Sequence, residues 1–424
     1  MHICVLGAGV IGVTSAWRLL QDGHQVTLVD ALPDAGGGTS FGNGAQLSYS
    51  YVAPLADPSV WSHWTHYLFS PASPLTLRPQ ADPAQWRWLL KFLAACNRER
   101  AQRTTLELLQ LAFLSRERLH RMLPALSFQF AFRTAGKLVM YDDAEALQGA
   151  RRQVAFQADY GCEQQVLDAA RCLEIEPALA AGSRRWAGGV YTPSEEVGDC
   201  AQFCRGLLEG MRADPRFCFA ASSPIGALDI AGGRLRSLRA GDTDLQADAF
   251  VLALGADSAA FARRAGFTLP IYPLKGYSIT VPLENPTPQS APQVSITDIA
   301  RKIVYARLDD RLRVAGRVEL VGRDGAIPPR AVTELRQGVR ELFPAHGDWP
   351  DSATLAPWAG FRPATPTGVP IIGAAPLKNL YLNVGHGALG WTLACGSAEL
   401  LADRIAGRAP AIDPAPFQLS SRRA

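Results

Sequence analysis

The residues best suited to chemistry near the start of the sequence are glycines spaced to hold a phosphate. Gly7, Gly9 and Gly12 directly follow a short apolar run over residues 2–6 and precede a stretch of helical periodicity. In such a strand–turn–helix unit the first glycine allows a tight turn and the second lets the backbone approach a pyrophosphate. The third permits close packing of the helix on the strand. The N–H groups at the start of that helix would face the phosphates.

A second apolar run, residues 25–29, closes this unit and ends in Asp30, whose carboxylate suits the hydroxyls of a ribose. The strand, glycines, helix, second strand and acid, in that order, predict a dinucleotide site. The residues expected to contact the ligand here are Gly7, Gly9, Val10, Ile11, Gly12 and Asp30.

The loop over residues 39–46 favours FAD over NAD, which the first motif alone does not distinguish. FAD is longer on its flavin side and needs more backbone and hydroxyl donors along its pyrophosphate and ribityl chain. Small residues allow a loop to come close enough to supply them. A plain surface loop is the alternative interpretation. The contacts expected from this loop are Thr39, Ser40, Asn43, Gly44, Ala45 and Gln46.

Two further strand-to-glycine turns are expected to reach the same cofactor. Residues 249–256 predict a buried strand ending in glycine, and residues 380–384 predict a strand followed by a glycine-rich turn and a helix over residues 393–405. The N-terminus of that helix carries positive dipole, which suits the extra charge of a reduced flavin. The contacts expected from these segments and from the turn at Pro224 are Ile225, Ala253, Gly255, Gly387, Ala388, Leu389, Gly390, Trp391 and Thr392.

The order of these elements predicts an α/β protein with two interleaved domains, because 424 residues are too many for one compact unit. We assign residues 1–50, 195–265 and 356–424 to a Rossmann-like FAD-binding domain. Residues 51–194 and 266–355 form an α+β substrate-binding domain in this prediction. Helical periodicity extends over residues 84–123, and alternating strands from residue 270 to residue 317 predict a mixed or antiparallel sheet.

Composition argues against several other classes of protein. The net charge is only +3 and the cations are scattered, so no nucleic-acid partner is expected. No apolar run reaches the roughly 18 residues of a spanning helix, and the early first strand leaves no room for a signal peptide, which predicts a cytoplasmic protein. The eight cysteines and the His63/His66 pair lack metal-site spacing, so no metal is expected. An aromatic segment over residues 61–69 favours either packing or contact with a membrane or partner.

Taken together, these motifs resemble those of the small subunit of bacterial D-amino acid dehydrogenases. That group lies within the D-amino acid oxidase superfamily of FAD-dependent oxidoreductases, which includes glycine oxidase and sarcosine oxidase. The matching stretches keep the family's order over nearly the whole chain. They are VLGAGVIGVTSAW (residues 5–17), TSF (39–41), YPLKGYSIT (272–280), GFRP (360–363) and GHGALGWT (385–392).

The resemblance implies noncovalent FAD, oxidation of an amine to an imine, and release of a keto acid after hydrolysis. Electrons would pass to a quinone or other carrier. It also implies that an arginine binds the substrate carboxylate, and Arg362 stands in the matching position; a domain-interface ion pair is its alternative role. A guanidinium suits this task because it can donate two parallel hydrogen bonds. Tyr277 would border the pocket or pack in the core, and His386 would shape the flavin site or transfer a proton.

Two stretches depart from the family's pattern on the expected active-site side. Thr367 stands where many members have Asp, and residues 47–51 differ after Gln46. A cyclic or other secondary amino acid such as D-proline is therefore as good a candidate substrate as D-alanine. An oxygen-using amine oxidase, a nicotinamide-dependent dehydrogenase and a non-catalytic flavoprotein subunit are the alternative functions. Peripheral contact with the inner face of the cytoplasmic membrane and assembly as a homo- or hetero-oligomer are further expectations.

Overall fold

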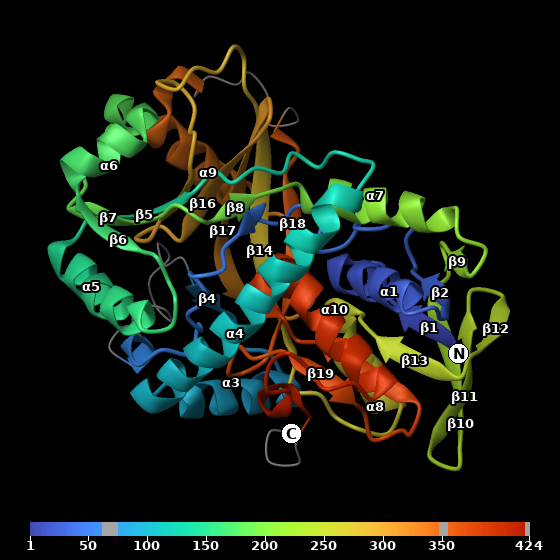
Figure 1. The fold of residues 1–424 in the computed structure, drawn as a ribbon. Coiled ribbons are helices and arrows are strands. Elements are labelled where there is room, and N and C mark those ends of the chain that lie inside the picture. Colours follow the sequence, from blue (N-terminus) through green and yellow to red (C-terminus); the bar gives the residue numbers. More distant parts are fainter. Residues whose placement is uncertain (62–74, 347–354, 420–424) are drawn as a thin grey trace.

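Two large β-sheets organise the protein, and helices cover their outer faces (Figure 1). The computed structural model describes residues 1–61, 75–346 and 355–419. The first sheet has six strands in the order β19-β20-β13-β1-β2-β9, and every neighbouring pair is parallel except β19-β20. Its strands are β1 (His2–Leu6), β2 (Gln25–Val29), β9 (Phe217–Ala220), β13 (Ala249–Leu252), β19 (Ile371–Ala374) and β20 (Leu380–Val384).

Both faces of this six-stranded sheet are buried, which explains its continuous apolar strands. Along β1, Ile3 and Val5 pack with helices α1, α4, α7 and α10, whereas Cys4 and Leu6 pack with α8 and the meander β10–β12. These helices are α1 (Val10–Gln21), α4 (Arg98–Met122), α7 (Cys200–Arg212), α8 (Ser258–Arg264) and α10 (Gly390–Ala406), and the meander strands are β10 (Ile225–Ala231), β11 (Arg234–Ala240) and β12 (Thr243–Gln246).

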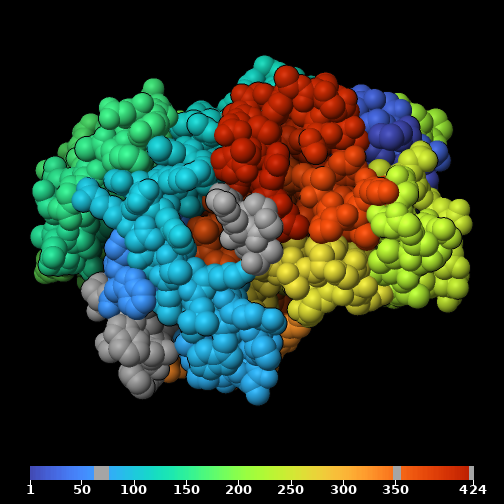
Figure 2. Space-filling model, turned by 90° about the horizontal axis from the view of Figure 1, so that it is seen from below, coloured from blue at the N-terminus to red at the C-terminus, as the bar shows by residue number. Residues whose placement is uncertain are grey.

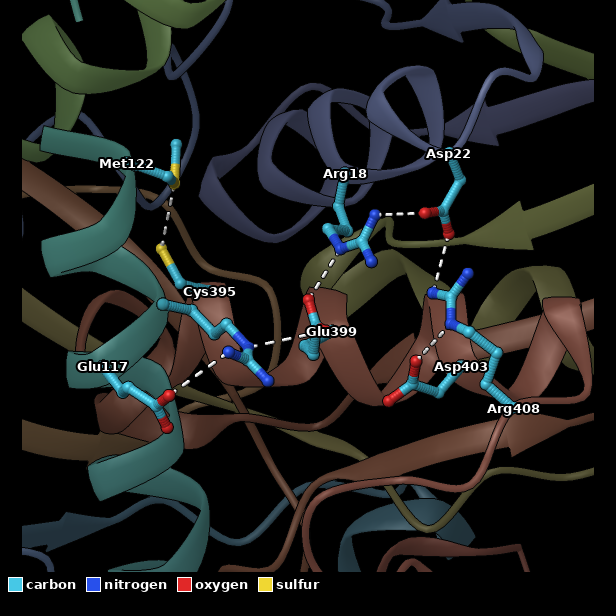
Figure 3. A network of polar contacts seen from close by, with 9 residues as sticks. Arg18, Asp22, Glu117, Met122, Cys395, Glu399, Asp403 and Arg408 are labelled. Carbon is cyan, nitrogen blue, oxygen red and sulfur yellow. Dashed lines mark hydrogen bonds and ion pairs between the residues drawn. The ribbon is translucent and has the colours of Figure 1, made fainter. Parts of the chain in front are cut away.

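Ion pairs connect three helices on one side of the six-stranded sheet (Figure 3). Arg18 of α1 contacts Glu399 of α10 at 2.6 Å, and Glu399 also contacts Arg118 of α4 at 3.4 Å. Just beyond α10, Arg408 contacts Asp22 at the end of α1 at 2.8 Å. Because α1 and α10 each begin at a predicted glycine turn, these pairs fix the two turns relative to one another.

The second sheet has nine strands in the order β18-β14-β17-β16-β15-β5-β7-β6, with β4 also paired to β17. It is mostly antiparallel, and β15-β5 and β17-β4 are parallel pairs. Helix α9 (Pro329–Leu342) covers one face. The strands are β4 (Leu75–Leu77), β5 (Lys137–Tyr141), β6 (Gln165–Asp168), β7 (Gly188–Thr192), β14 (Tyr272–Pro282), β15 (Ser295–Asp298), β16 (Ile303–Leu308), β17 (Arg311–Leu320) and β18 (Trp358–Ala364).

The helical stretch predicted over residues 84–123 is two helices, α3 (Pro83–Ala95) and α4. Asn97 leaves helical geometry, and its side chain caps α4 by accepting a hydrogen bond from the Arg100 N–H, which is why the helix breaks there. Helices α5 (Ala144–Ala158) and α6 (Ala169–Ile175) follow α4 along the chain. On the face shown in Figure 2, the α3–α4 region lies beside the C-terminal segment that contains α10.

The boundary predicted at residue 356 differs from the strand pairing. β18 hydrogen-bonds along β14 from Tyr272↔Ala364 to Ser278↔Trp358, so the chain belongs to the nine-stranded sheet until residue 364. The division into two functional domains itself stays a prediction. All eight cysteines are free, and Cys200 and Cys204 are buried on α7. Within the described ranges, no helix is long and apolar enough to span a membrane.

Candidate active site

Four of the predicted segments leave the six-stranded sheet at one edge. β1, β2, β13 and β20 are parallel, and their carboxyl ends lead directly to Gly7, Asp30, Ala253 and Gly385. Ligands of open α/β sheets bind outside the carboxyl ends of the strands. The structure therefore brings together turns that are up to about 380 residues apart in the sequence.

The first glycine turn has the geometry of a phosphate cradle. Gly7 has φ +105°, and a Cβ atom there would lie 2.5 Å from the carbonyl oxygen of Ala253. A Cβ at Gly12 would lie 1.7 Å from the Gly7 oxygen, so only glycine allows α1 to pack this closely. At Gly9 the nearest atom to an added Cβ is Ser40 Oγ at 3.5 Å. Gly7 and Gly12 are thus required by packing, whereas Gly9 borders open space.

The N-terminus of α1 presents backbone donors at this space. The Val10 N–H donates to Ser40 Oγ at 3.0 Å, and the first intrahelical bond runs from the Val13 N–H to the Gly9 oxygen. The N–H groups of Ile11 and Gly12 precede that bond and have no intrahelical acceptor. No acidic residue stands in the first turn, so the positive end of the helix is available to an anion.

Two backbone N–H groups hold the Asp30 carboxylate in place. Its Oδ2 accepts from the Ala8 N–H at 2.6 Å and its Oδ1 from the Leu32 N–H at 2.8 Å. Each carboxylate oxygen has a second lone pair, which leaves acceptor capacity for a vicinal diol. The Ser223 N–H donates to the Asp30 carbonyl oxygen at 2.7 Å, and Ile225 follows Ser223 by two residues. Ile225 is half-buried at the start of β10.

The loop over residues 39–46 lies between the two sheets. Thr39 Oγ1 donates to the Phe361 oxygen of β18 at 3.0 Å, and a Cβ at Gly42 would lie 2.4 Å from the ring of Trp358. Arg313 of β17 donates to the Phe41 and Asn43 oxygens at 3.2 and 2.9 Å. The loop, β14, β17 and β18 line an open pocket of about 400 Å³. Its lining includes Phe41, Gly42, Ser278, Thr280, Arg311, Arg313 and Trp358.

The end of this loop is shaped by its own residues. Asn43 Oδ1 accepts from the Ala45 N–H at 2.9 Å, and Ala45 adopts a left-handed conformation with φ +58°. A Cβ at Gly44 would lie 2.9 Å from the Val304 side chain. The loop ends at Gln46 in the two-stranded sheet formed by β3 (Gln46–Leu47) and β8 (Glu196–Val197).

His386, in the third turn, is buried and hydrogen-bonded to Ser397. Its Nε2 lies 2.9 Å from Ser397 Oγ, and that hydroxyl donates its single hydrogen to the Leu393 oxygen at 2.8 Å. The hydrogen bond between them therefore uses an N–H on Nε2 of His386. Burial lowers the pKa of His386 to about 3, so the ring is neutral and weakly basic. Of the two predicted roles, the structure favours shaping the turn.

The residues after His386 differ in which of their groups are left available to a ligand. Gly385 and Gly387 have φ +84° and +54°, and nothing lies within 4 Å of a Cβ added at Gly387. The predicted contact Trp391 packs its ring against Phe203 at 4.7 Å, and its Nε1 donates to the Gly198 oxygen. Only its backbone remains for a ligand, since the side chain is core. Thr392 Oγ1 accepts from the Ser48 N–H at 3.1 Å. Gly387, Ala388, Leu389 and Gly390 form the short helical turn that opens α10.

Arg362 lies on the face of the nine-stranded sheet that looks toward the 39–46 loop. Arg362 and Trp358 are four residues apart in β18, so their side chains point to the same face of the sheet, and Trp358 lines the pocket beside Gly42. The guanidinium crosses Gly276, where a Cβ would lie 2.3 Å from Nη2, and Nη1 donates to the Arg317 oxygen at 3.0 Å. Burial lowers the pKa of Arg362 to about 10 although part of its surface stays accessible. No carboxylate pairs with it among the residues that the structure describes.

Of the two roles predicted for Tyr277, its position in the structure favours packing in the core. Its neighbour in sequence, Gly276, faces Arg362, so Tyr277 points to the opposite face of β14. There it packs in the cluster under α9, and its hydroxyl donates to Glu319 at 2.6 Å. Burial and Glu319 raise the pKa of Tyr277, which keeps the phenol protonated.

Sequence reasoning missed a group of buried polar side chains beside the loop over residues 39–46, which is called the flavin loop below. Lys137, at the start of β5, donates to Gln46 Oε1 at 2.7 Å and to Ser48 Oγ at 2.9 Å. Glu195 accepts from the N–H groups of Tyr49 and Ser50 at 2.6 and 2.7 Å. The only sequence signal was a lysine inside an apolar run and an acidic pair before a helix. A second pocket, about 270 Å³ beside the ion pairs of Figure 3, contains none of the predicted site residues.

Comparison with known proteins identifies the family. The family described as FAD dependent oxidoreductase (DAO) matches residues 2–404. The chain belongs to this family. Its sequence is 51% identical over 99% of the chain and 100% of the relative to D-amino acid dehydrogenase 2 of Ralstonia nicotianae. It is 45% identical to D-amino acid dehydrogenase 2 of Pseudomonas aeruginosa, over 97% of the chain and 96% of the relative.

Solved structures share the fold of this DAO-family chain. Glycine oxidase from Geobacillus kaustophilus superposes with a TM-score of 0.76 and 22% identity, over 99% of this chain and 98% of that one. L-proline dehydrogenase from P. horikoshii gives a TM-score of 0.72 at 16% identity, over 96% and 94%. The predicted family, the fold of a Rossmann-like FAD-binding unit with a mixed sheet, and FAD as cofactor are confirmed. The individual contacts to FAD stay predictions.

The cradle described above fits FAD. Gly9 borders open space, the first N–H groups of α1 lack intrahelical acceptors, and Asp30 retains acceptor capacity. Gly255 and Gly387, at the ends of β13 and β20, also border open space at positive φ. These features suit the pyrophosphate, the ribose and the flavin end of a long dinucleotide lying along one sheet edge.

Proposed function

We propose that this protein is an FAD-dependent dehydrogenase that oxidises D-amino acids to imines, which hydrolyse to keto acids. The observation that carries the proposal is Arg362, a half-buried residue on the sheet face that looks toward the 39–46 loop, whose guanidinium has no carboxylate partner within the described ranges. The names of the two relatives support the same chemistry. A buried cation with no carboxylate partner in the described part of the chain suits a substrate that brings its own carboxylate.

The protein's contribution to the reaction is binding and orientation. Bound FAD supplies the hydride acceptor. Arg362 would bind the carboxylate through two parallel hydrogen bonds and so fix which substituents of the α-carbon face the flavin. Gly276 leaves room for the guanidinium to cross the strand, and the Arg317 oxygen holds Nη1 in place. The substrate must be in its neutral amine form for hydride loss, and no side chain is assigned as its base.

The substrate class includes simple and cyclic D-amino acids. The segment 47–51, which departs from the family's usual pattern, follows Gln46 beside the flavin loop. Its Tyr51 keeps accessible surface while burial raises its pKa, which suits the wall of an internal space. A D-proline-like imino acid carries the same carboxylate and α-hydrogen as D-alanine, so Arg362 would orient both.

The electron acceptor in this proposal is a quinone or another carrier at the inner face of the cytoplasmic membrane. Helix α3 supports peripheral contact because it exposes Trp86 and Leu90, with relative accessibilities of 45% and 67%. Arg87 and Lys91 flank these residues, and α3 contains no acidic residue. Exposed Trp and Leu beside cations suit an anionic lipid surface. Assembly as a homo- or hetero-oligomer stays part of the proposal.

An anaerobic titration tests the proposal. The purified yellow protein is mixed with D- and L-alanine, D- and L-proline and glycine, and the flavin absorbance is followed. D-amino acids are expected to bleach the flavin at least tenfold faster than their L-enantiomers. Turnover is then measured with an artificial dye and by oxygen uptake, and the dye should support the faster rate. Bleaching by L-enantiomers alone, or no bleaching at all, refutes the proposal; faster oxygen uptake would make the protein an amine oxidase.

A further inference from the structure

The segment over residues 46–51 is held by side chains rather than by a sheet. It contributes only two residues to a two-stranded sheet, through Gln46↔Val197 and Leu47↔Glu196. The Ser48 N–H donates to Thr392 at the start of α10, and Gln157 of α5 donates to the Ser50 oxygen at 2.9 Å. Such a short ladder does not fix a strand alone, so the remaining contacts decide where the segment lies.

Lys137 contacts three side chains of this segment. Its Nζ donates to Gln46 Oε1 and Ser48 Oγ, and it lies 4.3 Å from the centre of the Tyr51 ring. Lys137 is 2% exposed, so each of its interactions is with protein. Burial lowers its pKa to about 8. Burying an ammonium group is costly unless its partners compensate, and the side chains that Lys137 contacts through hydrogen bonds and the ring contact all belong to one segment.

Two buried carboxylates hold the same segment from its other side. Glu195 binds the backbone N–H groups of Tyr49 and Ser50, and Glu196 accepts from the Tyr49 hydroxyl at 2.8 Å. Glu195 and Glu196 are 1% and 0% exposed. Burial raises the pKa of Glu195 to about 7, and the nearby Lys137 opposes that rise. The cation therefore binds the side chains of the segment while the anions bind its backbone and Tyr49.

We propose that Lys137 is a positioning residue for the flavin site, which fixes Gln46 and Tyr51 while Glu195 fixes the backbone between them. This inference rests on the proposed function, since Gln46 ends the loop expected to contact FAD and Tyr51 suits a wall of the substrate space. Lys137 acts through these residues and touches neither cofactor nor substrate. Displacement of such a wall by about 1 Å can cost about a hundredfold in rate.

Lys137→Met tests this role, and Lys275→Met is its matched control. Lys275 is 1% exposed in the same sheet, and its Nζ lies 5.2 Å from the Tyr277 ring and donates to the Ala326 oxygen. It belongs to the face that α9 covers, away from the flavin loop. Both variants lose a buried ammonium with a similar environment. The readouts are the visible spectrum of bound flavin, the FAD dissociation constant, the rate of flavin reduction at saturating D-amino acid, and the melting temperature.

Lys137→Met is expected to shift the flavin spectrum and to slow flavin reduction at least tenfold. Lys275→Met should change the melting temperature while leaving the spectrum and reduction rate within twofold of the parent. Lys137→Arg should restore most of the reduction rate, because a guanidinium can still bind Gln46 and Ser48. If Lys137→Met does not fold, Glu195→Gln replaces it. This substitution weakens the hydrogen bonds from Tyr49 and Ser50, which hold the same segment from its other side, and should produce the same spectral shift.

The inference is overturned if Lys137→Met and Glu195→Gln change only the melting temperature, as a purely structural pair would. It is also overturned if Lys275→Met alters the flavin spectrum equally. These outcomes are separable from failure of the proposed function. If the parent protein binds FAD but no amino acid bleaches it, the flavin spectrum and the FAD dissociation constant of the variants still test whether Lys137 positions the flavin site.

Discussion

Replacement of Arg362 by Met should make the protein more stable and less active at once. Burial lowers the pKa of Arg362 from 12.5 to about 10. At about 1.4 kcal/mol per pKa unit, enclosing this charge costs about 2 to 3 kcal/mol once its partial exposure is considered. The hydrogen bond to the Arg317 oxygen returns about 1 kcal/mol. The Met variant should therefore gain about 1 to 2 kcal/mol, which is roughly 1 to 2 °C in melting temperature for a chain of this length.

The same substitution removes the partner of the substrate carboxylate. Breaking a buried charge pair costs about 3 kcal/mol or more, so kcat/KM should fall more than a hundredfold. The FAD content should not change. The corresponding amine without a carboxylate is the matched substrate: it should be poor for the parent protein and no poorer for Arg362→Met.

The assays are thermal unfolding of the FAD-bound protein and steady-state dye reduction with both substrates. A variant that melts several degrees lower or loses FAD would show that Arg362 is a structural connection between the sheets. A variant whose kcat/KM stays within threefold of the parent would remove Arg362 from the pocket. Either result refutes the reasoning.

Three further substitutions separate the roles of individual positions. Gly9→Val should fold, because an added Cβ meets only Ser40 Oγ at 3.5 Å, but should lose bound FAD; a fully yellow variant would contradict the phosphate cradle. Gly276→Ala should retain FAD and lose about ten- to a hundredfold in kcat/KM, because its Cβ displaces the Arg362 guanidinium; unchanged kinetics would mean that this conformation is irrelevant. His386 has a folded-state pKa of about 3 against an ordinary 6.5, so the stability it provides is complete above pH 6.5 and lost as pH falls toward 3. Between pH 6.5 and 5 the parent should lose about 2 kcal/mol more than His386→Gln in urea unfolding, and equal losses would exclude a buried neutral ring.

The residues that could be predicted from the sequence are those whose role is local. Gly12 is required by its contact with Gly7 in the same strand–turn–helix unit, and Gly7 by its φ of +105° in the turn, so their spacing in the sequence contains that information. Asp30 follows the second strand of the same unit. The convergence of the later turns follows from the sheet, because its parallel strands β1, β2, β13 and β20 end at one edge.

Residues whose role depends on pairing between distant strands could not be placed in the same way. Gly276 and Tyr277 are neighbours in an apolar strand, and successive residues of a strand point to opposite faces of the sheet. A shift of the strand by one residue would therefore place Tyr277 instead of Gly276 on the face of Arg362. β18 pairs along β14, so residues 358–364 are strand neighbours of the nine-stranded sheet, a pairing that no local pattern near residue 356 indicates. Lys137 binds a segment about 90 residues earlier in the chain, and no local sequence pattern predicts that contact.

Hydrogen exchange of the protein with FAD bound and after its removal tests most directly whether the separate turns hold one cofactor. FAD is expected to protect the backbone amides of residues 8–13, 39–46, 253–255 and 387–392 together, with a single affinity. Protection confined to one of these segments, or found mainly around the pocket between α1, α4 and α10, would contradict this expectation.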